Sequence, residues 1–406
     1  MDIRPFAIQV ADSDLEDLHR RLEAVRPPGG VPGAGWAYGA EPGYVDGLLR
    51  SWREHDWRAA ESRLNTLPQF IAEIGELAVH FVHLKGEGPD PMPLMLSHGW
   101  PSSLIEWTDI IGPLTDPASH GGDPADAFSV VVPSLPGYGF SHKGHVPNLT
   151  PRRIAAAFTE LMPALGYPRF GAHGCDWGSY VTALMALDAP DQLIGAHMGM
   201  VSLSAHGRRG GPEGECEDAE QRAARRVWSQ REWGYVSIQS TKPQTLAYGL
   251  ADSPAGLAAW IAEKWRAWSD HDGDPDAAIP RQRLLDTLSL YWFTNCINSA
   301  NRLYYESRWN PVELAAGQRV KVPSGFFLER SSADRGHGAR DMTLRPPPTR
   351  RSAAAKVFDI QRWFESPRGG HFPALETPDL LVEELRAFFR PLRLTTNCLG
   401  RSAMWL

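Results

Sequence analysis

The stretch GAHGCDWGSY, residues 171–180, decides the fold, because it joins a short strand, a sharp turn and the start of a helix. Its centre, Gly174-Cys175-Asp176-Trp177-Gly178, follows the pattern G-x-S-x-G, in which a tight turn lifts its middle side chain above the end of a sheet. The two glycines let such a turn close. The middle position holds an aspartate, Asp176, in place of the serine. On its own, the pattern also fits a plain strand–turn–helix with a surface aspartate.

Strand-like and helical segments alternate on both sides of this turn. MPLMLS (92–97), SVVVP (129–133) and LIGAHM (193–198) are short apolar runs typical of buried strands. A helix is expected to begin with Thr150 as its N-cap and Pro151 as its first residue. This alternation predicts an α/β protein with a mostly parallel central sheet flanked by helices.

Changes in composition divide the chain into five expected parts. The N-terminal segment is predicted to be helical and meandering, with one helix capped by Asp12 or Ser13 and another that includes residues 58–74. A later segment, rich in Trp, Ala, Arg and Glu, interrupts the alternation and is predicted to form an inserted helical cap. The expected parts are the N-terminal segment (1–80), the first half of the core (81–201), the cap (202–315), the second half of the core (316–392) and a loose tail (393–406).

Composition excludes several classes of function. The 406 residues carry a formal net charge of -7, which argues against a nucleic-acid-binding protein. No metal-ligand spacing and no phosphate-binding glycine loop occurs, so no cofactor or metal is expected. The sequence has no signal peptide and no apolar run long enough to span a bilayer, so a cytoplasmic protein is expected. The four cysteines lack CxxC spacing and are expected to be free thiols; they are Cys175, Cys216, Cys296 and Cys398.

Two further motifs stand in the order that an α/β-hydrolase requires. SHGWPSS, residues 97–103, lies upstream of the turn, where a loop supplies a backbone N–H to an oxyanion hole. The expected donors are the backbone N–H groups of Trp100 and Trp177. RGGHF, residues 368–372, precedes a last helix, so His371 is the candidate base. The three motifs together favour an α/β-hydrolase.

An aspartate in the turn changes the expected chemistry. A carboxylate can attack an electrophilic carbon without first losing a proton, and it forms an alkyl ester on the protein. Water activated by His371 would then attack the carbonyl carbon of that ester. A serine would form an ether, which water does not readily cleave. Asp176 therefore indicates the opening of a C–O or C–halogen bond, and Cys175, one position earlier, is a weaker alternative nucleophile.

Over nearly its whole length the chain resembles the microsomal-type epoxide hydrolases, which are α/β-hydrolases with an N-terminal epoxide-hydrolase domain. The motifs that carry the resemblance include RPFAIQVADSDLEDLHRRL, DWRAAESRLNTLPQF, LSHGWPSSLIEW, PSLPGYGFS, GCDWGSYV, LYWFTNCINSANRLYY and PRGGHFPALETPDLLVEELRAFF. Mammalian members carry a membrane anchor before this domain. Because this chain starts at the domain itself, a soluble member of the bacterial type is expected.

The resemblance also implies two tyrosines in the cap that protonate the epoxide oxygen as the ring opens. They match Tyr235 in WGYVSIQ and Tyr304 in NRLYYES, where Tyr305 is adjacent. Two alternatives stay open at this point. One is a haloalkane dehalogenase, with Trp177 as a halide donor, and the other is a protein of the same fold that binds a small apolar ligand without turnover.

The acid of the catalytic triad is where the chain departs from the family pattern. Members carry a short F-P-x-[ED] turn after the strand that corresponds to VKVPSGFFL, and here the sequence continues as ERSSADRGHGARDMTLRPPP. Asp341 is favoured as the acid over Asp334 and Glu329. The acid would fix the tautomer of His371 and stabilise its protonated form.

The aromatic residues of the cap suggest a hydrophobic, aromatic epoxide as the substrate. A homodimer is compatible with the sequence, and no nucleic acid or membrane partner is expected. Detoxification and secondary metabolism, including antibiotic biosynthesis, are both roles that related bacterial enzymes fill.

Overall fold

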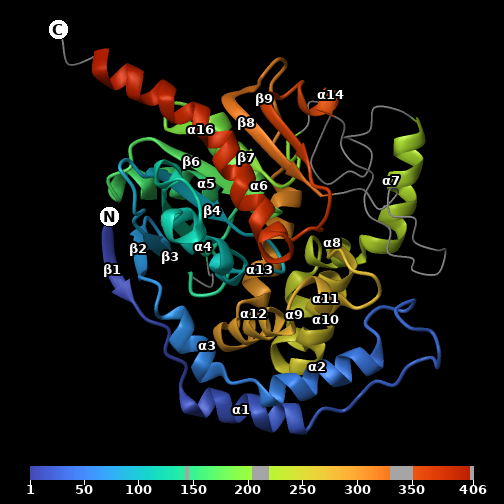
Figure 1. Ribbon diagram of the computed structural model, residues 1–406. Helices are drawn as coiled ribbons and strands as arrows, with labels where there is room; N and C mark the ends of the chain where they lie inside the picture. The colour runs from blue at the N-terminus through green and yellow to red at the C-terminus, as the bar shows by residue number, and fades with distance from the viewer. Residues whose placement is uncertain (142–145, 204–218, 330–350, 403–406) are drawn as a thin grey trace.

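A nine-stranded sheet forms the centre of the protein in the computed structural model, which describes residues 1–141, 146–203, 219–329 and 351–402 (Figure 1). The strand order across the sheet is β1-β2-β3-β5-β4-β6-β7-β8-β9. The strands are β1 (Asp2–Phe6), β2 (Gln69–Ile74), β3 (Leu77–Leu84), β4 (Met92–Ser97), β5 (Phe128–Pro133), β6 (Phe170–Gly174), β7 (Leu193–Met198), β8 (Val320–Leu328) and β9 (Phe358–Glu365).

The sheet is parallel from β5 to β9 and antiparallel at the edge that β1, β2 and β3 form. Strands β5, β6 and β7 are buried at every position, as expected of parallel strands covered on both faces. The prediction of a mostly parallel α/β sheet is therefore confirmed.

Helices of the core cover both faces of the sheet. On one side α5 (Pro151–Ala164) packs on α6 (Trp177–Asp188), and on the other α4 (Thr108–Thr115) packs on α16 (Pro378–Ser402). Helix α5 starts as predicted, because the Thr150 side chain accepts a hydrogen bond from the N–H of Arg153 and Pro151 is the first helical residue. Shorter helical turns in the core are η1 (Leu104–Trp107), η2 (Ala118–His120), η3 (Pro124–Asp126), α14 (Arg351–Ala354) and α15 (Pro373–Glu376).

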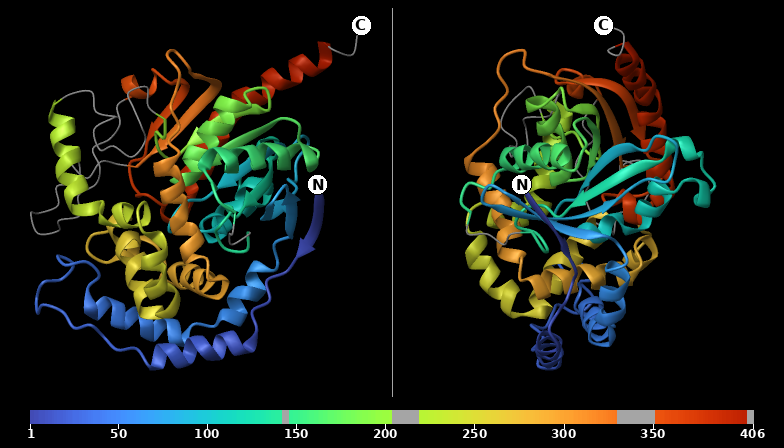
Figure 2. Two further views of the ribbon diagram at one scale, coloured as in Figure 1. Left: turned by 180° about the vertical axis from the view of Figure 1, so that it is seen from behind. Right: turned by 90° about the vertical axis from the view of Figure 1, so that its left-hand side faces the viewer.

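The described part of the cap is helical, and the helices of the N-terminal segment run along its side away from the sheet (Figure 2). Helix α1 and helix α2 contact α10, and α3 contacts α12. The cap helices are α7 (Ala219–Glu232), α8 (Gly234–Gln239), α9 (Pro243–Asp252), α10 (Pro254–Trp268), α11 (Pro275–Ala278), α12 (Arg281–Thr294) and α13 (Ile297–Trp309). The N-terminal helices are α1 (Asp12–Glu23), α2 (Pro42–Glu54) and α3 (Trp57–Leu64).

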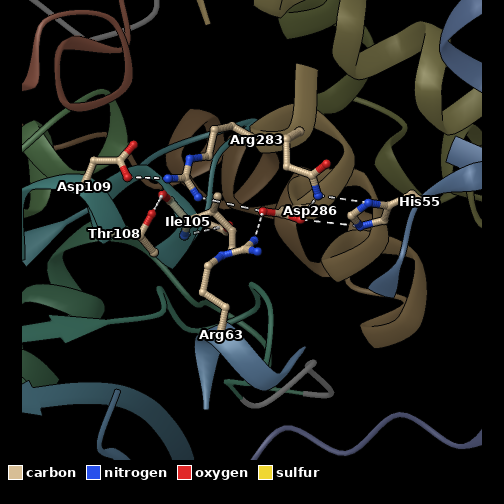
Figure 3. A network of polar contacts seen from close by, with 9 residues as sticks. His55, Arg63, Ile105, Thr108, Asp109, Arg283 and Asp286 are labelled. Atoms are coloured by element: carbon tan, nitrogen blue, oxygen red, sulfur yellow. Dashed lines mark hydrogen bonds and ion pairs between the residues drawn. The ribbon is translucent and has the colours of Figure 1, made fainter. Parts of the chain in front are cut away.

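Asp286 and Arg283 on α12 join the cap to the N-terminal segment and to the core, respectively (Figure 3). The Asp286 side chain is fully buried, and its Oδ2 accepts a hydrogen bond of 2.5 Å from Arg63 of α3. The Nε2 atom of His55 lies 3.4 Å from Oδ1, and burial lowers the pKa of that histidine. Arg283, one turn before Asp286, forms an ion pair with Asp109 of the core helix α4. The N-terminal segment therefore contacts the cap at Asp286, and the core contacts it one turn earlier, at Arg283.

We expect Asp286→Asn to lower the free energy of unfolding by about 1–3 kcal/mol, because a buried acceptor of charged hydrogen bonds is lost while Arg63 stays in place. Urea denaturation of the whole chain measures this difference. Asp46→Asn is the matched control, because its ion pair with Arg50 has side chains that are 67% and 62% exposed. The control should change stability by less than about 1 kcal/mol. Equal losses in the two variants would contradict a special role of the Asp286 contacts.

Three sequence-based expectations for local structure are wrong. The predicted helix over residues 58–74 ends at Leu64, and residues 69–74 form β2, because Pro68 cannot continue the helix. Residues 2–6 form β1 at the edge of the sheet. The first helix is capped by Ala11 and not by Asp12 or Ser13, and no side chain caps it.

The expected loose tail is also wrong where the structure describes it, because α16 continues to Ser402. Arg390 forms an ion pair with Asp126, and Arg393 donates to three backbone carbonyls of residues 125–127. Arg393, the first residue of the expected tail, is therefore attached to the segment just before β5.

Candidate active site

The turn between β6 and α6 has the geometry that its sequence predicts. Asp176 has φ 49° and ψ -119°, a backbone conformation in which a non-glycine residue is strained. A Cβ atom on Gly174 would lie 2.2 Å from the carbonyl carbon of Gly178, and one on Gly178 would lie 1.9 Å from the carbonyl oxygen of Ser97. Only glycine fits at these two positions. The close contact with the end of β4 therefore confines the turn to a shape that directs the Asp176 side chain toward the loop after β4.

Asp176 faces the predicted oxyanion loop and the predicted base. The backbone N–H of Trp100 donates a hydrogen bond of 3.0 Å to its Oδ1. The Nε2 atom of His371 lies 3.7 Å from its Oδ2, and within the described residues this nitrogen has no hydrogen-bond partner. A gap of this length is too wide for a direct hydrogen bond. Trp177, the second expected donor, is the first residue of α6, and N–H groups in the first turn of a helix have no partner inside the helix.

The cap holds the loop that carries Trp100. The indole N–H of Trp265 donates to the carbonyl of Pro101 at 3.1 Å, and the hydroxyl of Tyr291 donates to the carbonyl of Ser102 at 2.9 Å. Both donors are buried. The oxyanion loop is thus fixed by two side chains of the cap as well as by the strand before it.

The loop around His371 is fixed mainly by Glu376. The backbone N–H groups of Gly370 and Phe372, on either side of the histidine, donate to the two oxygens of this carboxylate at 2.8 and 3.0 Å. The N–H of His371 itself donates to the carbonyl of Trp268 at 2.8 Å, and the two rings lie 4.9 Å apart. The position of the imidazole therefore depends on the cap helix α10 as well as on the core.

The structure brings the two predicted cap tyrosines together over the oxyanion loop. The rings of Tyr235 and Tyr304 lie 5.8 Å apart, and Tyr235 stacks on Trp100 at 5.1 Å with an angle of 11°. Burial raises the pKa of Tyr304 well above its usual range, and the nearby Tyr235 and Asp176 raise it further. Tyr304 therefore keeps its proton at neutral pH. Tyr305, the neighbour with which it could be confused, is 38% exposed and packs against Trp309.

The acid of the triad stays a prediction. Asp341 and Asp334 lie outside the described residues. Glu329 follows directly on the end of β8. Among the described residues, the carboxylate of Asp176 lies within ion-pair distance of the His371 ring.

Glu106 is a residue of this site that the sequence did not reveal. It lies in η1, just after the oxyanion loop, and is 1% exposed. Burial raises its pKa to about 8, and the charge of Asp176 raises it further, while contacts with Ser102 and Cys175 oppose the shift. A second carboxyl group beside the nucleophile is therefore largely protonated at neutral pH. No motif marks this position, because a single glutamate in a helical run is ordinary.

Cys175, the alternative nucleophile, is poorly placed for that role. It is 3% exposed, and burial together with the charges of Glu106 and Asp176 raises its pKa well above its usual range. A thiol that keeps its proton is a weak nucleophile. The Sγ atom points toward the ring of His173, whose Nε2 lies 3.7 Å away in the core.

Glu106 should make the stability of the protein depend on pH. The folded state keeps a proton that the unfolded chain releases above about pH 4.5. The contribution of Glu106 to the free energy of unfolding is fully present below that pH and is lost as the pH rises through about 8. Glu106→Gln cannot titrate, so it should not lose this stability at high pH. Its free energy of unfolding minus that of the wild type should therefore rise by on the order of 3 kcal/mol between about pH 5 and about pH 8.5. Urea denaturation across that range measures the slope.

Glu16→Gln is the control for this experiment, because Glu16 is exposed on α1 and should leave the slope of the wild type unchanged. If Glu106→Gln has the same pH dependence as this control, the buried carboxyl is not protonated in the folded state.

No group of three or more His, Cys, Asp or Glu side chains within the described residues could hold a metal ion. None of the helices described is both long and apolar enough to span a bilayer.

Comparison with known proteins agrees with this arrangement. The family description "Epoxide hydrolase N terminus" matches residues 3–107, and the description "alpha/beta hydrolase fold" matches residues 92–206. A putative epoxide hydrolase of Stigmatella aurantiaca is 39% identical over 96% of this chain and 86% of its own length. Epoxide hydrolase 1 of Oryctolagus cuniculus is 33% identical over 95% of this chain and 88% of its own length.

Solved structures show the same architecture. The epoxide hydrolase of Aspergillus niger superposes with a TM-score of 0.79 and 29% identity, over 97% of both chains. The juvenile hormone epoxide hydrolase of Bombyx mori superposes with a TM-score of 0.77 and 28% identity, over 97% of this chain and 94% of its own.

The sheet, the strained turn and the loop that faces it define an α/β-hydrolase, as the order of the motifs predicted. Within that class, the chain belongs to the microsomal-type epoxide hydrolase family, and it is accordingly an epoxide hydrolase.

Proposed function

We propose that this enzyme converts a hydrophobic, aromatic epoxide to a vicinal diol through a covalent ester on Asp176. The observation that carries the proposal is the setting of the Asp176 carboxylate. One of its oxygens accepts the N–H of Trp100, and the other lies 3.7 Å from Nε2 of His371. A carboxylate held between an oxyanion donor and a base is suited to forming an ester and then to losing it by hydrolysis.

The first step is the opening of the epoxide ring. An oxygen of Asp176 attacks a ring carbon, the C–O bond of the epoxide breaks, and the released oxygen takes a proton from Tyr235 or Tyr304. An alkoxide is a poor leaving group in water, so an acid beside it lowers the barrier. Burial of Tyr304 keeps its proton available, and both rings lie over the loop that binds Asp176.

The second step is hydrolysis of the ester. Water gives a proton to Nε2 of His371 and attacks the carbonyl carbon of Asp176, and the oxyanion that forms accepts hydrogen bonds from the backbone N–H groups of Trp100 and Trp177. The distance of 3.7 Å between Nε2 and the carboxylate leaves the nitrogen free to bind that water. An acid, with Asp341 favoured over Asp334, would hold the imidazole in the required tautomer.

The aromatic surroundings of the site support the proposed substrate class. Trp100, Trp177 and Trp268 all contact the two tyrosines or His371. Flat apolar side chains of this kind stack on aromatic groups. An aromatic epoxide would place its ring among them and its oxygen at the phenols.

The two alternatives have less support. A dehalogenase would need the indole N–H of Trp177 for the halide, but the phenol ring of Tyr304, which suits an epoxide oxygen, packs edge-on against this indole at 4.9 Å. A protein that only binds its ligand would have no need of the strained turn at Asp176. Release of chloride from a haloalkane, or binding of an epoxide without diol, would favour one or the other.

The covalent route predicts where solvent oxygen goes. In one turnover with styrene oxide in oxygen-18 water, label should enter the carboxylate of Asp176, while the first diol formed stays largely unlabelled. Peptide mass spectrometry across residues 171–180 detects the label. Asp176→Asn should form neither ester nor diol at first, because an amide is a poor nucleophile. Labelled diol without label in Asp176 would mean direct attack by water.

The proposed proton donors predict a difference between neighbouring tyrosines. Tyr304→Phe and Tyr235→Phe should each slow formation of the ester about 10- to 100-fold, because the leaving oxygen loses a donor. Tyr305→Phe is the control, since its ring is 38% exposed and packs against Trp309, and it should change the rate less than about twofold. Rapid-quench measurement of the ester tests this. Equal losses for Tyr304→Phe and Tyr305→Phe would contradict the assignment.

A further inference from the structure

A buried lysine lies over the ring of Tyr235. Lys264, on α10, is 7% exposed, and its Nζ is 5.1 Å from the centre of that ring. An ammonium group loses strong hydration when it is buried, so this position costs free energy unless the surroundings compensate for it. The chemistry proposed above does not use this residue.

Two glutamates accompany the lysine. Oε2 of Glu263, the preceding residue on α10, lies 2.9 Å from Nζ, and Oε2 of Glu232, at the end of α7, lies 3.4 Å away. Burial raises the pKa of Glu232 above its usual value, although Lys264 opposes the shift. Because Glu263 is next to Lys264 in sequence, the ion pair between them could also form at the surface. The pair therefore does not explain why the ammonium lies against an aromatic ring inside the cap.

The surroundings of Tyr235 explain why a charge there matters. The ring stacks on Trp100, whose N–H holds Asp176, and its edge contacts include Tyr304. Among the described residues, the charged and titratable groups near Tyr235 include Lys264 and Glu263 from α10, Glu232 from α7, Tyr304 from α13 and, across Trp100, Asp176 of the core. Lys264 is the cation whose nitrogen lies over the Tyr235 ring.

We propose that Lys264 is a positioning residue that makes Tyr235 a stronger proton donor in ring opening, an inference that rests on the function proposed above. As the ester bond to Asp176 forms and the C–O bond of the epoxide breaks, the O–H bond of Tyr235 also breaks and its proton passes to the epoxide oxygen. Negative charge then appears on the phenol oxygen, and the ammonium over the ring stabilises it.

The proton balance closes over the full reaction. Ring opening leaves a phenolate at Tyr235 and a hydroxyl on the substrate. In hydrolysis, one water supplies the hydroxyl that ends on Asp176 and a proton that His371 passes to the departing alcohol oxygen. The carboxylic acid formed on Asp176 then loses its proton, and the phenolate regains one. Neither an oxidant nor a further reactant is needed.

The test compares Lys264→Met with Lys264→Arg, using styrene oxide and rapid-quench measurement of ester formation and ester hydrolysis. Lys264→Met should slow ester formation about tenfold at neutral pH and leave hydrolysis within about twofold. The alkaline limit of ester formation is the pH above which the rate falls because the phenol of Tyr235 has lost its proton. Lys264→Met should move this limit to higher pH, because loss of the cation raises the pKa of the phenol. Lys264→Arg keeps the charge and should retain most of the rate.

Glu232→Gln provides a change of opposite sign. Removing a negative charge beside Lys264 should move the alkaline limit of ester formation to lower pH. A loss of packing would not shift the two variants in opposite directions, so this pair separates an electrostatic effect from a structural one even if Lys264→Met is less stable.

A double variant with Tyr235→Phe completes the test. In that background, Lys264→Met should slow ester formation no further, since the group on which it acts is gone. A tenfold loss that persists there, or an alkaline limit that Lys264→Met does not move, would overturn the inference. Absence of diol and of the Asp176 ester in the wild type would instead overturn the proposed function.

Discussion

The contact between the turn at Asp176 and the end of β4 is the constraint on which the rest of the site depends. The carbonyl oxygen of Ser97 lies where a side chain on Gly178 would begin, and Gly174 faces Gly178 just as closely. The chain between the two glycines must therefore bend sharply, and Asp176 takes a positive φ. The same contact brings the loop after β4 beside the carboxylate, so that the N–H of Trp100 reaches it. One steric condition thus places both the nucleophile and its oxyanion donor.

Around this turn, burial sets different protonation states for groups that are close together. Asp176 keeps a path to solvent and a hydrogen bond from a backbone N–H, whereas Glu106 is enclosed and holds a proton near neutral pH. Tyr304 is enclosed as well and remains a phenol. The site therefore offers one partly exposed carboxylate to an electrophile and retains protons on the groups that surround it. This separation is typical of acid–base sites built on a fold with a low-dielectric interior.

Local patterns in the sequence predicted the parts of the structure that local physics determines. The glycines of the turn, the Thr150 cap and the inward-facing Tyr304 follow from steric fit, hydrogen bonding within one turn and motif context. The strand at residues 69–74 was missed because its pairing with β3 outweighs a helical pattern. No local pattern marks Glu106 or Lys264, because their roles arise from contacts with residues far away in sequence. The acid after β8 could not be assigned, since the residues that replace the family motif give no local signal.

The position of Asp286 has a consequence for exchanging parts between related enzymes. This buried cap residue accepts a hydrogen bond from Arg63 and lies 3.4 Å from His55, both of the N-terminal segment, while Arg283, one turn earlier, forms an ion pair with the core. A cap moved alone onto another α/β-hydrolase core would carry a buried carboxylate without the guanidinium of Arg63 that pairs with it. Recombination between such proteins would therefore succeed more readily when the crossover points keep the first 65 or so residues and the cap from the same parent.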